Sequence, residues 1–324
     1  MIRNIAVSSV VDSLSFGTPK TQMRRIAMYA IDRIESALTR ALARATQSPT
    51  ETGAKNECPP KFAAALNYSV FPGGGRFRPR LCLAVAAACG EDHPECTDAA
   101  AVAIELMHCA SLVHDDLPCF DNASSRRGKP SVHRAHGERL AVLSGDALIV
   151  LAFQEVARAG LVAPERLPAL LAIVAESVGA PHGIAAGQAW ECESTVSLAA
   201  YQQAKTGALF VASTMAGAAS AGHDAKPWRA LGMALGEAYQ VADDLHDAVD
   251  TEEELGKPVG RDAALGRPSA AIDLGIAGAV QRLNLLLANA IDSIPECAGA
   301  VPLRAVIAAE AGRLMPKRLR LRAA

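Results

Sequence analysis

Aromatic side chains are scarce in this chain of 324 residues, making up 4% of it, although half of the residues are hydrophobic. Alanine is abundant instead, so the core has to be built from many small side chains. Small side chains favour closely packed helices over a β-sandwich, and no segment alternates between apolar and polar residues for long enough to predict a strand. We therefore expect an all-α fold, and the chain is long enough to bury a large core.

An excess of either charge is also missing. The 32 basic and 34 acidic residues give a formal net charge of −2, which offers no general attraction for nucleic acid. The eight cysteines include no CxxC pair, and several lie in apolar runs, as small core residues do in a reducing compartment. We therefore expect a cytoplasmic protein with no nucleic-acid partner.

Long hydrophobic runs are absent too. Residues 1–16 contain only a short apolar run that Asp12 interrupts, which makes a poor signal peptide. The longest uncharged stretch, residues 206–222, falls slightly short of the about 20 residues that span a bilayer. This stretch is rich in Ala, Gly, Ser and Thr, which favours a buried helix with close neighbours. We expect no transmembrane span.

Apolar residues at helical spacing dominate the rest of the chain. They predict helices over residues 23–46, 78–90, 97–117, 139–160, 164–180, 198–222, 227–249 and 268–293. Proline and glycine separate these segments, and the composition of residues 47–60 is typical of a polar linker. We expect a loose extension over residues 1–22 and a single α-helical domain over residues 23–324.

Charges of both signs follow the predicted helix 97–117, in the segment LVHDDLPCFDNASSRRGKPSVH (112–133). It places Asp115, Asp116 and Asp121 close together and then adds Arg126 and Arg127. The proline at position 118 should end the helix, so the third aspartate has to return from the following loop. Because arginine forks bind phosphate oxygens in pairs, the carboxylates and guanidinium groups together indicate a phosphate ester.

A second aspartate motif, YQVADDLHD (239–247), again lies at the polar end of an apolar helix. Asp243 and Asp247 are four residues apart, so they share one helix face with Gln240. Like charges at this spacing repel each other, and a bound cation would relieve the repulsion. Carboxylates with no nearby cysteine or suitably spaced histidine favour Mg²⁺. Two solvated acidic helix ends are the alternative, but they do not account for two such motifs and an arginine pair.

Five motifs, in this order and spacing, resemble those of the short-chain trans-prenyltransferases, or polyprenyl diphosphate synthases. They are GGGRFRP (73–79), DDLPCFDNASSRRGKP (115–130), KTGALF (205–210), YQVADDLHD (239–247) and GKPVGRD (256–262). The resemblance covers about residues 60–270 and is strongest to geranylgeranyl diphosphate synthases of the carotenoid-pathway type. It implies a single isoprenoid-synthase-like bundle of many helices around a central cavity, usually as a homodimer.

The resemblance also implies roles for individual residues. The Mg²⁺ ligands would be Asp115, Asp116 and Asp121 from the first motif and Asp243, Asp244 and Asp247 from the second. Contacts to the allylic diphosphate would come from Arg126, Lys205, Thr206 and Gln240, and contacts to isopentenyl diphosphate from Arg78, His108 and Arg127. Catalysis would rest on Asp115, Asp116, Asp121, Arg126, Lys205 and Asp243.

The implied reaction is the head-to-tail condensation of isopentenyl diphosphate with an allylic diphosphate. Mg²⁺ and basic side chains stabilise the departing pyrophosphate, and an apolar cavity keeps water from the allylic cation. The resemblance implies that Ala110 and Ser111, just before the first motif, lie in the cavity wall. It also implies that bacterial relatives that stop at fifteen carbons carry an aromatic residue at the Ala110 position. We therefore expect the twenty-carbon product, geranylgeranyl diphosphate.

Two positions depart from the family pattern. Gly75 and Arg267 stand where the family usually has lysine, and the change at Gly75 removes a cation for isopentenyl diphosphate. Arg76, Arg78 or Arg80 could partly replace that cation. A positive-φ turn at Gly75 would leave no unstrained place for a lysine there.

Three other functions compete with this interpretation: a farnesyl diphosphate synthase, a terpene cyclase and a non-catalytic subunit of a prenyltransferase heterodimer. A cyclase usually combines one DDxxD motif with a different metal motif. A non-catalytic subunit would normally lose aspartates from one motif, whereas this chain keeps both sets.

Overall fold

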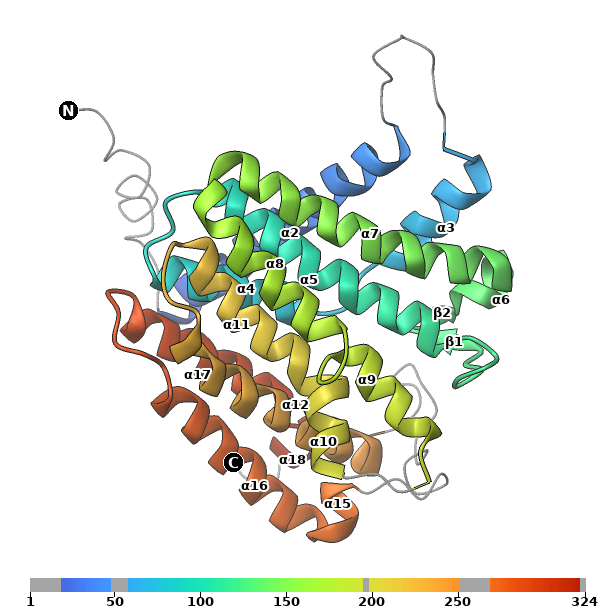
Figure 1. Ribbon diagram of the computed structural model, residues 1–324. Coiled ribbons are helices and arrows are strands. Elements are labelled where there is room, and N and C mark those ends of the chain that lie inside the picture. Colours follow the sequence, from blue (N-terminus) through green and yellow to red (C-terminus); the bar gives the residue numbers. More distant parts are fainter. Residues whose placement is uncertain (1–18, 48–57, 195–197, 251–268, 321–324) are drawn as a thin grey trace, which may run out of the picture.

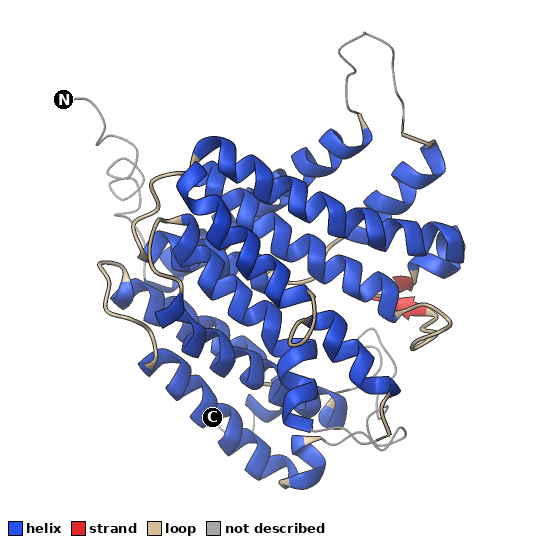
Figure 2. Ribbon diagram, viewed as in Figure 1, coloured by secondary structure: helices blue, strands red, loops and turns tan. Residues whose placement is uncertain are grey.

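The computed structural model describes residues 19–47, 58–194, 198–250 and 269–320, which fold almost entirely into helices (Figure 2). The longer helices are α2 (Pro19–Thr46), α3 (Pro60–Val70), α4 (Phe77–Ala88), α5 (Pro94–Asp115), α7 (Glu138–Val162), α8 (Leu167–Val178), α11 (Ala208–Ser220), α12 (Arg229–Val249), α16 (Gly275–Asp292) and α17 (Ala300–Leu314). The shorter ones are α6 (Val132–His136), η1 (Pro164–Arg166), α9 (Ile184–Ala189), η2 (Trp190–Cys192), α10 (Leu198–Gln202), η3 (Gln203–Gly207), η4 (Lys226–Trp228), α15 (Ala270–Asp273) and α18 (Lys317–Arg320). The prediction of an all-α fold is confirmed.

Three details differ from the sequence prediction. The predicted helix 198–222 is interrupted by η3, which is a π-helix. Helix α2 begins at Pro19, so residues 19–22 are helical although we expected them to be loose, and residues 1–18 lie outside the described part. A hairpin that the sequence did not predict pairs β1 (Ser125–Arg126) with β2 (Lys129–Pro130). Strands of two residues are too short to show an alternating pattern of apolar and polar residues.

Two large hydrophobic clusters and one small one form the interior, and α4 and α11 contribute to both large ones. One cluster joins these two helices to α2, α5, α7 and α8, and the other joins them to α12, α16 and α17. In Figure 1, α4 and α11 accordingly run between these two groups of helices. The small residues of α11 permit close packing, since a Cβ added to Gly217 would lie 2.5 Å from the carbonyl oxygen of Cys82. This confirms the expectation of a buried helix with close neighbours.

Two of the described helices, α5 and α7, are long and apolar enough to cross a membrane by length and composition alone. The most apolar window of α5 is 83% buried inside the protein, as in a core helix, and that of α7 is 44% buried. One or two such helices are weak grounds for a membrane span, so the expectation of none stays a prediction. The exposed large apolar side chains of α7 are Val142, Leu143, Val150, Leu161 and Val162.

A buried ion pair anchors the glycine-rich segment GGGRFRP to the helices. Arg76 donates to Glu105 of α5 at 2.6 Å and to Glu35 of α2 at 2.7 Å, and its side chain is 1% exposed. Its backbone is left-handed (φ 48°), which lets the side chain turn back beneath Gly73. A Cβ at Gly73 would lie 2.1 Å from the guanidinium carbon, so any other residue there would displace the Arg76 side chain. These contacts therefore fix the position of the segment just before α4 begins.

Candidate active site

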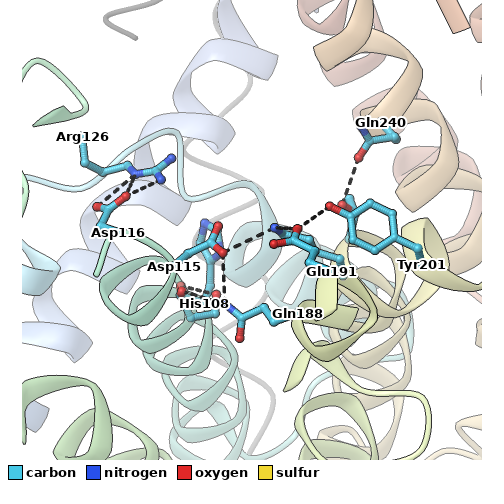
Figure 3. A network of polar contacts seen from close by, with 11 residues as sticks. His108, Asp115, Asp116, Arg126, Gln188, Glu191, Tyr201 and Gln240 are labelled. Atoms are coloured by element: carbon cyan, nitrogen blue, oxygen red, sulfur yellow. Dashed lines mark hydrogen bonds and ion pairs between the residues drawn. The ribbon is translucent and has the colours of Figure 1, made fainter. Parts of the chain in front are cut away.

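The first aspartate motif begins at the last residue of α5. Asp115 and Asp116 are both buried, and the backbone N–H of Asp121 donates to the Asp115 carbonyl oxygen at 3.0 Å. The loop after Pro118 therefore does return to the helix end, as the sequence predicted. Asp116 turns to the hairpin, where Arg126 donates to its Oδ1 from Nη2 at 2.5 Å and from Nε at 3.1 Å (Figure 3).

The carboxylate of Asp115 lies on the other side of this helix end (Figure 3). Lys205 Nζ and Gln188 Nε2 both lie 3.4 Å from its Oδ1. Burial raises the pKa of Asp115, the charges of Asp121 and Glu191 raise it further, and Lys205 and Arg126 oppose the rise. A cation bound at this carboxylate would favour its charged form.

The π-helix η3 directs two consecutive side chains to the two aspartate motifs. Lys205 reaches Asp115, while Thr206 Oγ1 donates to Gln240 Oε1 at 3.0 Å on α12. An inserted residue of this kind changes side-chain directions locally, and π-helical turns often occur at functional sites. Burial alone would lower the pKa of Lys205, but Asp115, Tyr201 and Glu191 outweigh burial and raise it, so the lysine stays charged.

Glycines clamp η3 from both sides. A Cβ added to Gly187 of α9 would lie 2.4 Å from the backbone nitrogen of Lys205. A Cβ added to Gly236 of α12 would lie 2.8 Å from Cα of Gly207. Because both contacts meet backbone atoms, the place of Lys205 is set by main-chain packing.

The second aspartate motif is oriented by a chain of hydrogen bonds that starts at Thr206. Gln240 Nε2 donates to Asp244 Oδ1 at 3.0 Å, and Asp244 Oδ2 accepts from the backbone N–H of Ala270 at 2.8 Å. Asp244 is buried, so it links α12 to the start of α15. Asp243 and Asp247 are partly exposed and lie one helical turn apart on α12.

A second group of basic side chains gathers around His108 on α5. Arg78 Nη1 and Arg127 Nη2 each lie 3.5 Å from its Nε2. Burial lowers the pKa of His108 well below its usual range, and the charges of both arginines lower it further, so the ring is neutral. Arg78 lies over the rings of Phe210 and Tyr239, 4.7 and 5.5 Å from their centroids, and its buried Nε has no hydrogen-bond partner.

The three arginines that could replace a lysine at position 75 differ in their contacts. Arg76 is held by its two glutamates, and Arg80 donates to Glu310 at 2.5 Å. Among the described residues, Arg78 has no carboxylate within ion-pair distance, so it is the one left for an incoming anion. Gly75 has no positive φ, and a Cβ there would meet nothing within 4 Å. The suggested positive-φ turn was therefore wrong.

The donor set for a metal consists of carboxylates. In the part of the chain that the structure describes, no three His, Cys, Asp or Glu side chains form a group that could hold an ion alone. Asp115, Asp121, Asp243 and Asp247 offer oxygen atoms, the donors that Mg²⁺ combines with water and phosphate oxygens. The chemistry of the site therefore fits Mg²⁺. A metal role stays a prediction for all six aspartates, and the oxygens of Asp116 and Asp244 are bonded to protein groups.

The two residues predicted in the cavity wall lie on α5 just before Asp115, where that role stays a prediction, and two other residues were missed. Ala110 is buried in the core, and Ser111 is buried with its hydroxyl donating to the His108 carbonyl oxygen at 2.9 Å. Gln188 and Glu191, which reach Asp115 and Lys205, were not predicted. Their only sequence signal is a spacing of three residues in a helical stretch before KTGALF. The motif GKPVGRD and Arg267 lie outside the described residues.

Comparison with known proteins identifies the family. The profile of the polyprenyl synthetase family matches residues 59–303. The chain belongs to this family. The match covers the glycine-rich segment, both aspartate motifs and η3, so the residues assembled above all lie within it.

Similar proteins and structures agree with this placement. The chain is 52% identical over 290 residues to a geranylgeranyl diphosphate synthase of Cereibacter sphaeroides, covering 90% of this chain and 98% of the relative. It is 55% identical over 283 residues to a geranylgeranyl diphosphate synthase of Rhodobacter capsulatus, covering 87% and 95%. A geranyltransferase from Helicobacter pylori, solved with magnesium and isoprenyl diphosphate, is 28% identical with a TM-score of 0.73, covering 92% and 98%. An isoprenoid-synthase-like fold is thereby confirmed.

The clamp on η3 leads to a prediction about Gly187. We expect Gly187→Ala to lower the free energy of unfolding by about 1–3 kcal/mol, since the new Cβ would press on the Lys205 backbone. Urea unfolding measures this. Gly312→Ala on α17 is the matched control, because its Cβ would meet nothing within 4 Å, and it should be neutral or slightly stabilising. Equal stability of the two variants would show that α9 can move away from η3 at no cost.

Proposed function

We propose that the chain catalyses the Mg²⁺-dependent head-to-tail condensation of isopentenyl diphosphate with an allylic diphosphate to give geranylgeranyl diphosphate. The observation that carries this proposal is that consecutive residues of η3 contact both aspartate motifs. Lys205 reaches Asp115, and Thr206 reaches Gln240, three residues before Asp243. Both sets of carboxylates and a charged lysine therefore belong to one site.

The allylic substrate needs groups that bind its diphosphate and stabilise it as it leaves. Lys205 and Arg126 are placed for this role, and the pairing of Arg126 with Asp116 uses Nε and Nη2 and leaves Nη1 to reach an anion. When bound at the aspartates, Mg²⁺ supplies further positive charge for the diphosphate oxygens. As the allylic C–O bond breaks, the electron pair goes to pyrophosphate, and these fixed cations stabilise the growing negative charge.

Isopentenyl diphosphate fits the second group of basic residues. Arg78 and Arg127 share a neutral His108 and flank the glycine-rich segment, where Gly74 lies against the Arg127 guanidinium. Two guanidinium groups side by side repel each other, and a diphosphate would relieve that repulsion and pair with the buried Arg78. The double bond of the bound substrate then attacks the allylic cation, and the new intermediate loses a proton.

The product length rests on two points. The relatives from Cereibacter and Rhodobacter are named for geranylgeranyl diphosphate. In this chain, Ala110 supplies a small buried side chain just over one helical turn before Asp115, where an aromatic ring would fill space. Both points favour the twenty-carbon product over farnesyl diphosphate. The intact aspartates in both motifs argue against a non-catalytic subunit.

We also propose a homodimer in a reducing cytoplasm. The exposed apolar side chains along α7 offer a surface that a second copy would cover, as the family resemblance implies. All eight cysteines are free, which suits a reducing compartment.

Product analysis tests the proposed reaction. Purified protein is incubated with Mg²⁺, isopentenyl diphosphate and, in turn, dimethylallyl, geranyl or farnesyl diphosphate, and the products are separated by chain length. We expect geranylgeranyl diphosphate, and near-complete loss of turnover with retained helical CD for Asp115→Ala and Asp243→Ala, since each removes a carboxylate ligand. Near-normal turnover of either variant at limiting Mg²⁺ would contradict the metal assignment. A farnesyl product would support the alternative function, a farnesyl diphosphate synthase.

Restoring the family lysine at position 75 should strengthen the binding of isopentenyl diphosphate by the basic residues around His108. We expect Gly75→Lys to lower the KM for isopentenyl diphosphate by about 5-fold or more, because a charge-assisted contact contributes about 1–3 kcal/mol and the position is open. Steady-state kinetics with each substrate varied in turn measures the effect, and Gly75→Gln is the neutral control. An unchanged KM at unchanged thermal stability would show that Arg78 and Arg127 already supply the needed charge.

A bulky side chain at Ala110 should shorten the product. We expect Ala110→Tyr to shift the main product from twenty to fifteen carbons, because the family resemblance implies that the growing chain passes this buried position and the ring would block its path. The added volume will also lower stability by about 1–3 kcal/mol. Chain-length analysis is therefore paired with a melting curve. A folded, active variant that still makes the twenty-carbon product would place the limit of the growing chain elsewhere.

A further inference from the structure

The unpredicted residue Glu191 holds the lysine that approaches the first aspartate motif. Its Oε1 lies 2.5 Å from Lys205 Nζ and also accepts a hydrogen bond from the Tyr201 hydroxyl at 2.6 Å (Figure 3). The same ammonium group lies 3.4 Å from Asp115 Oδ1. Charge-assisted bonds of this type are usually about 2.7–2.9 Å long, so Lys205 is bonded to Glu191 and only near Asp115.

The distance between Lys205 and Asp115 matters for cation binding. A lysine bonded directly to Asp115 would occupy the oxygen that a metal ion needs. Gln188 Nε2 also lies 3.4 Å from Asp115 Oδ1. Both side-chain donors near this oxygen, Gln188 and Lys205, are therefore farther away than in a short charge-assisted hydrogen bond. The carboxylate therefore stays buried and open to a cation.

The arrangement is built into the backbone. Glu191 lies in η2, directly after the helix in which Gly187 touches the Lys205 main chain. The distance between the glutamate and the lysine is thereby set by packing as well as by side-chain rotamers. The side chains of Lys205 and Glu191 are only 20% and 22% exposed, so water weakens their attraction less than at an open surface.

We propose that Glu191 is a positioning residue that keeps Lys205 off Asp115, so that the carboxylate can bind the metal and the ammonium can face the allylic diphosphate. This rests on the function proposed above. Without the charge of Glu191, Lys205 would move to its other carboxylate neighbour and compete with the metal.

Mn²⁺ binding to the substrate-free protein, followed by the EPR signal of the free ion, tests this without turnover. We expect Glu191→Gln to weaken Mn²⁺ binding by about 5–10-fold, in the usual range for the coupling of neighbouring charged groups. The kinetic counterpart is a KM for the allylic diphosphate raised by a similar factor, with the KM for isopentenyl diphosphate within about twofold of wild type. Glu193→Gln is the matched control, since it removes the same charge from an exposed position two residues away.

Removing any nearby negative charge also weakens cation binding, so the decisive comparison uses a background that lacks the lysine. In Lys205→Met protein, Glu191→Gln should change Mn²⁺ binding by less than about twofold, because there is no ammonium left to compete. An equal loss in both backgrounds would mean that Glu191 acts only through its field and would overturn the proposal. No loss in the wild-type background would overturn it too.

The outcomes separate this inference from the proposed function. If the wild type makes prenyl product and Glu191→Gln binds Mn²⁺ as the wild type does, only the role of Glu191 is wrong. If the wild type neither binds Mn²⁺ nor makes product, the proposed function and the inference are both wrong.

Discussion

The site depends on one constraint: consecutive side chains of a π-helix have to reach two different aspartate motifs. Successive side chains of a helix diverge by about 100° per residue, so Lys205 meets Asp115 while Thr206 meets Gln240, and the irregular turn at η3 sets the direction of both. Gly187 and Gly236 hold this turn through backbone contacts on both sides. The ordering of α9, η3 and α12 therefore sets where substrate charge can be bound.

The two parts of the site, around Asp115 and around His108, differ in how their charges are paired. Around Asp115, Arg126 and Lys205 each have a carboxylate partner, and the acidic groups there fit a metal ion. Around His108, Arg78 and Arg127 share a neutral ring, and Arg78 has no carboxylate at ion-pair distance among the described residues. A buried guanidinium without a partner is costly, which favours binding of an anion there. Metal-bound and arginine-bound diphosphates would then lie at different positions along one face of α5, at Asp115 and around His108, which are seven residues apart.

The residues of the candidate site could be picked out from the sequence because their chemistry is local. A proline after paired aspartates predicted the end of α5 and the return of Asp121, and both were confirmed. The partners of Asp116 and Asp244 could not be predicted, since they come from a hairpin and from the start of α15, and periodicity gives a helix face without naming its neighbour. The π-helix was hidden because one inserted residue hardly disturbs an apolar pattern. Glu191 was missed because it lies outside every motif.

The most direct measurement of where the two diphosphates bind is a crystal structure with Mg²⁺, isopentenyl diphosphate and an allylic thiodiphosphate. The thiodiphosphate reacts slowly, so both ligands can be seen before they condense. The account predicts the allylic diphosphate at Lys205 and Arg126, with metal ions between it and the aspartates of both motifs. It also predicts the second diphosphate against Arg78 and Arg127. Both diphosphates bound at the aspartates, or Arg78 without an anion, would contradict it.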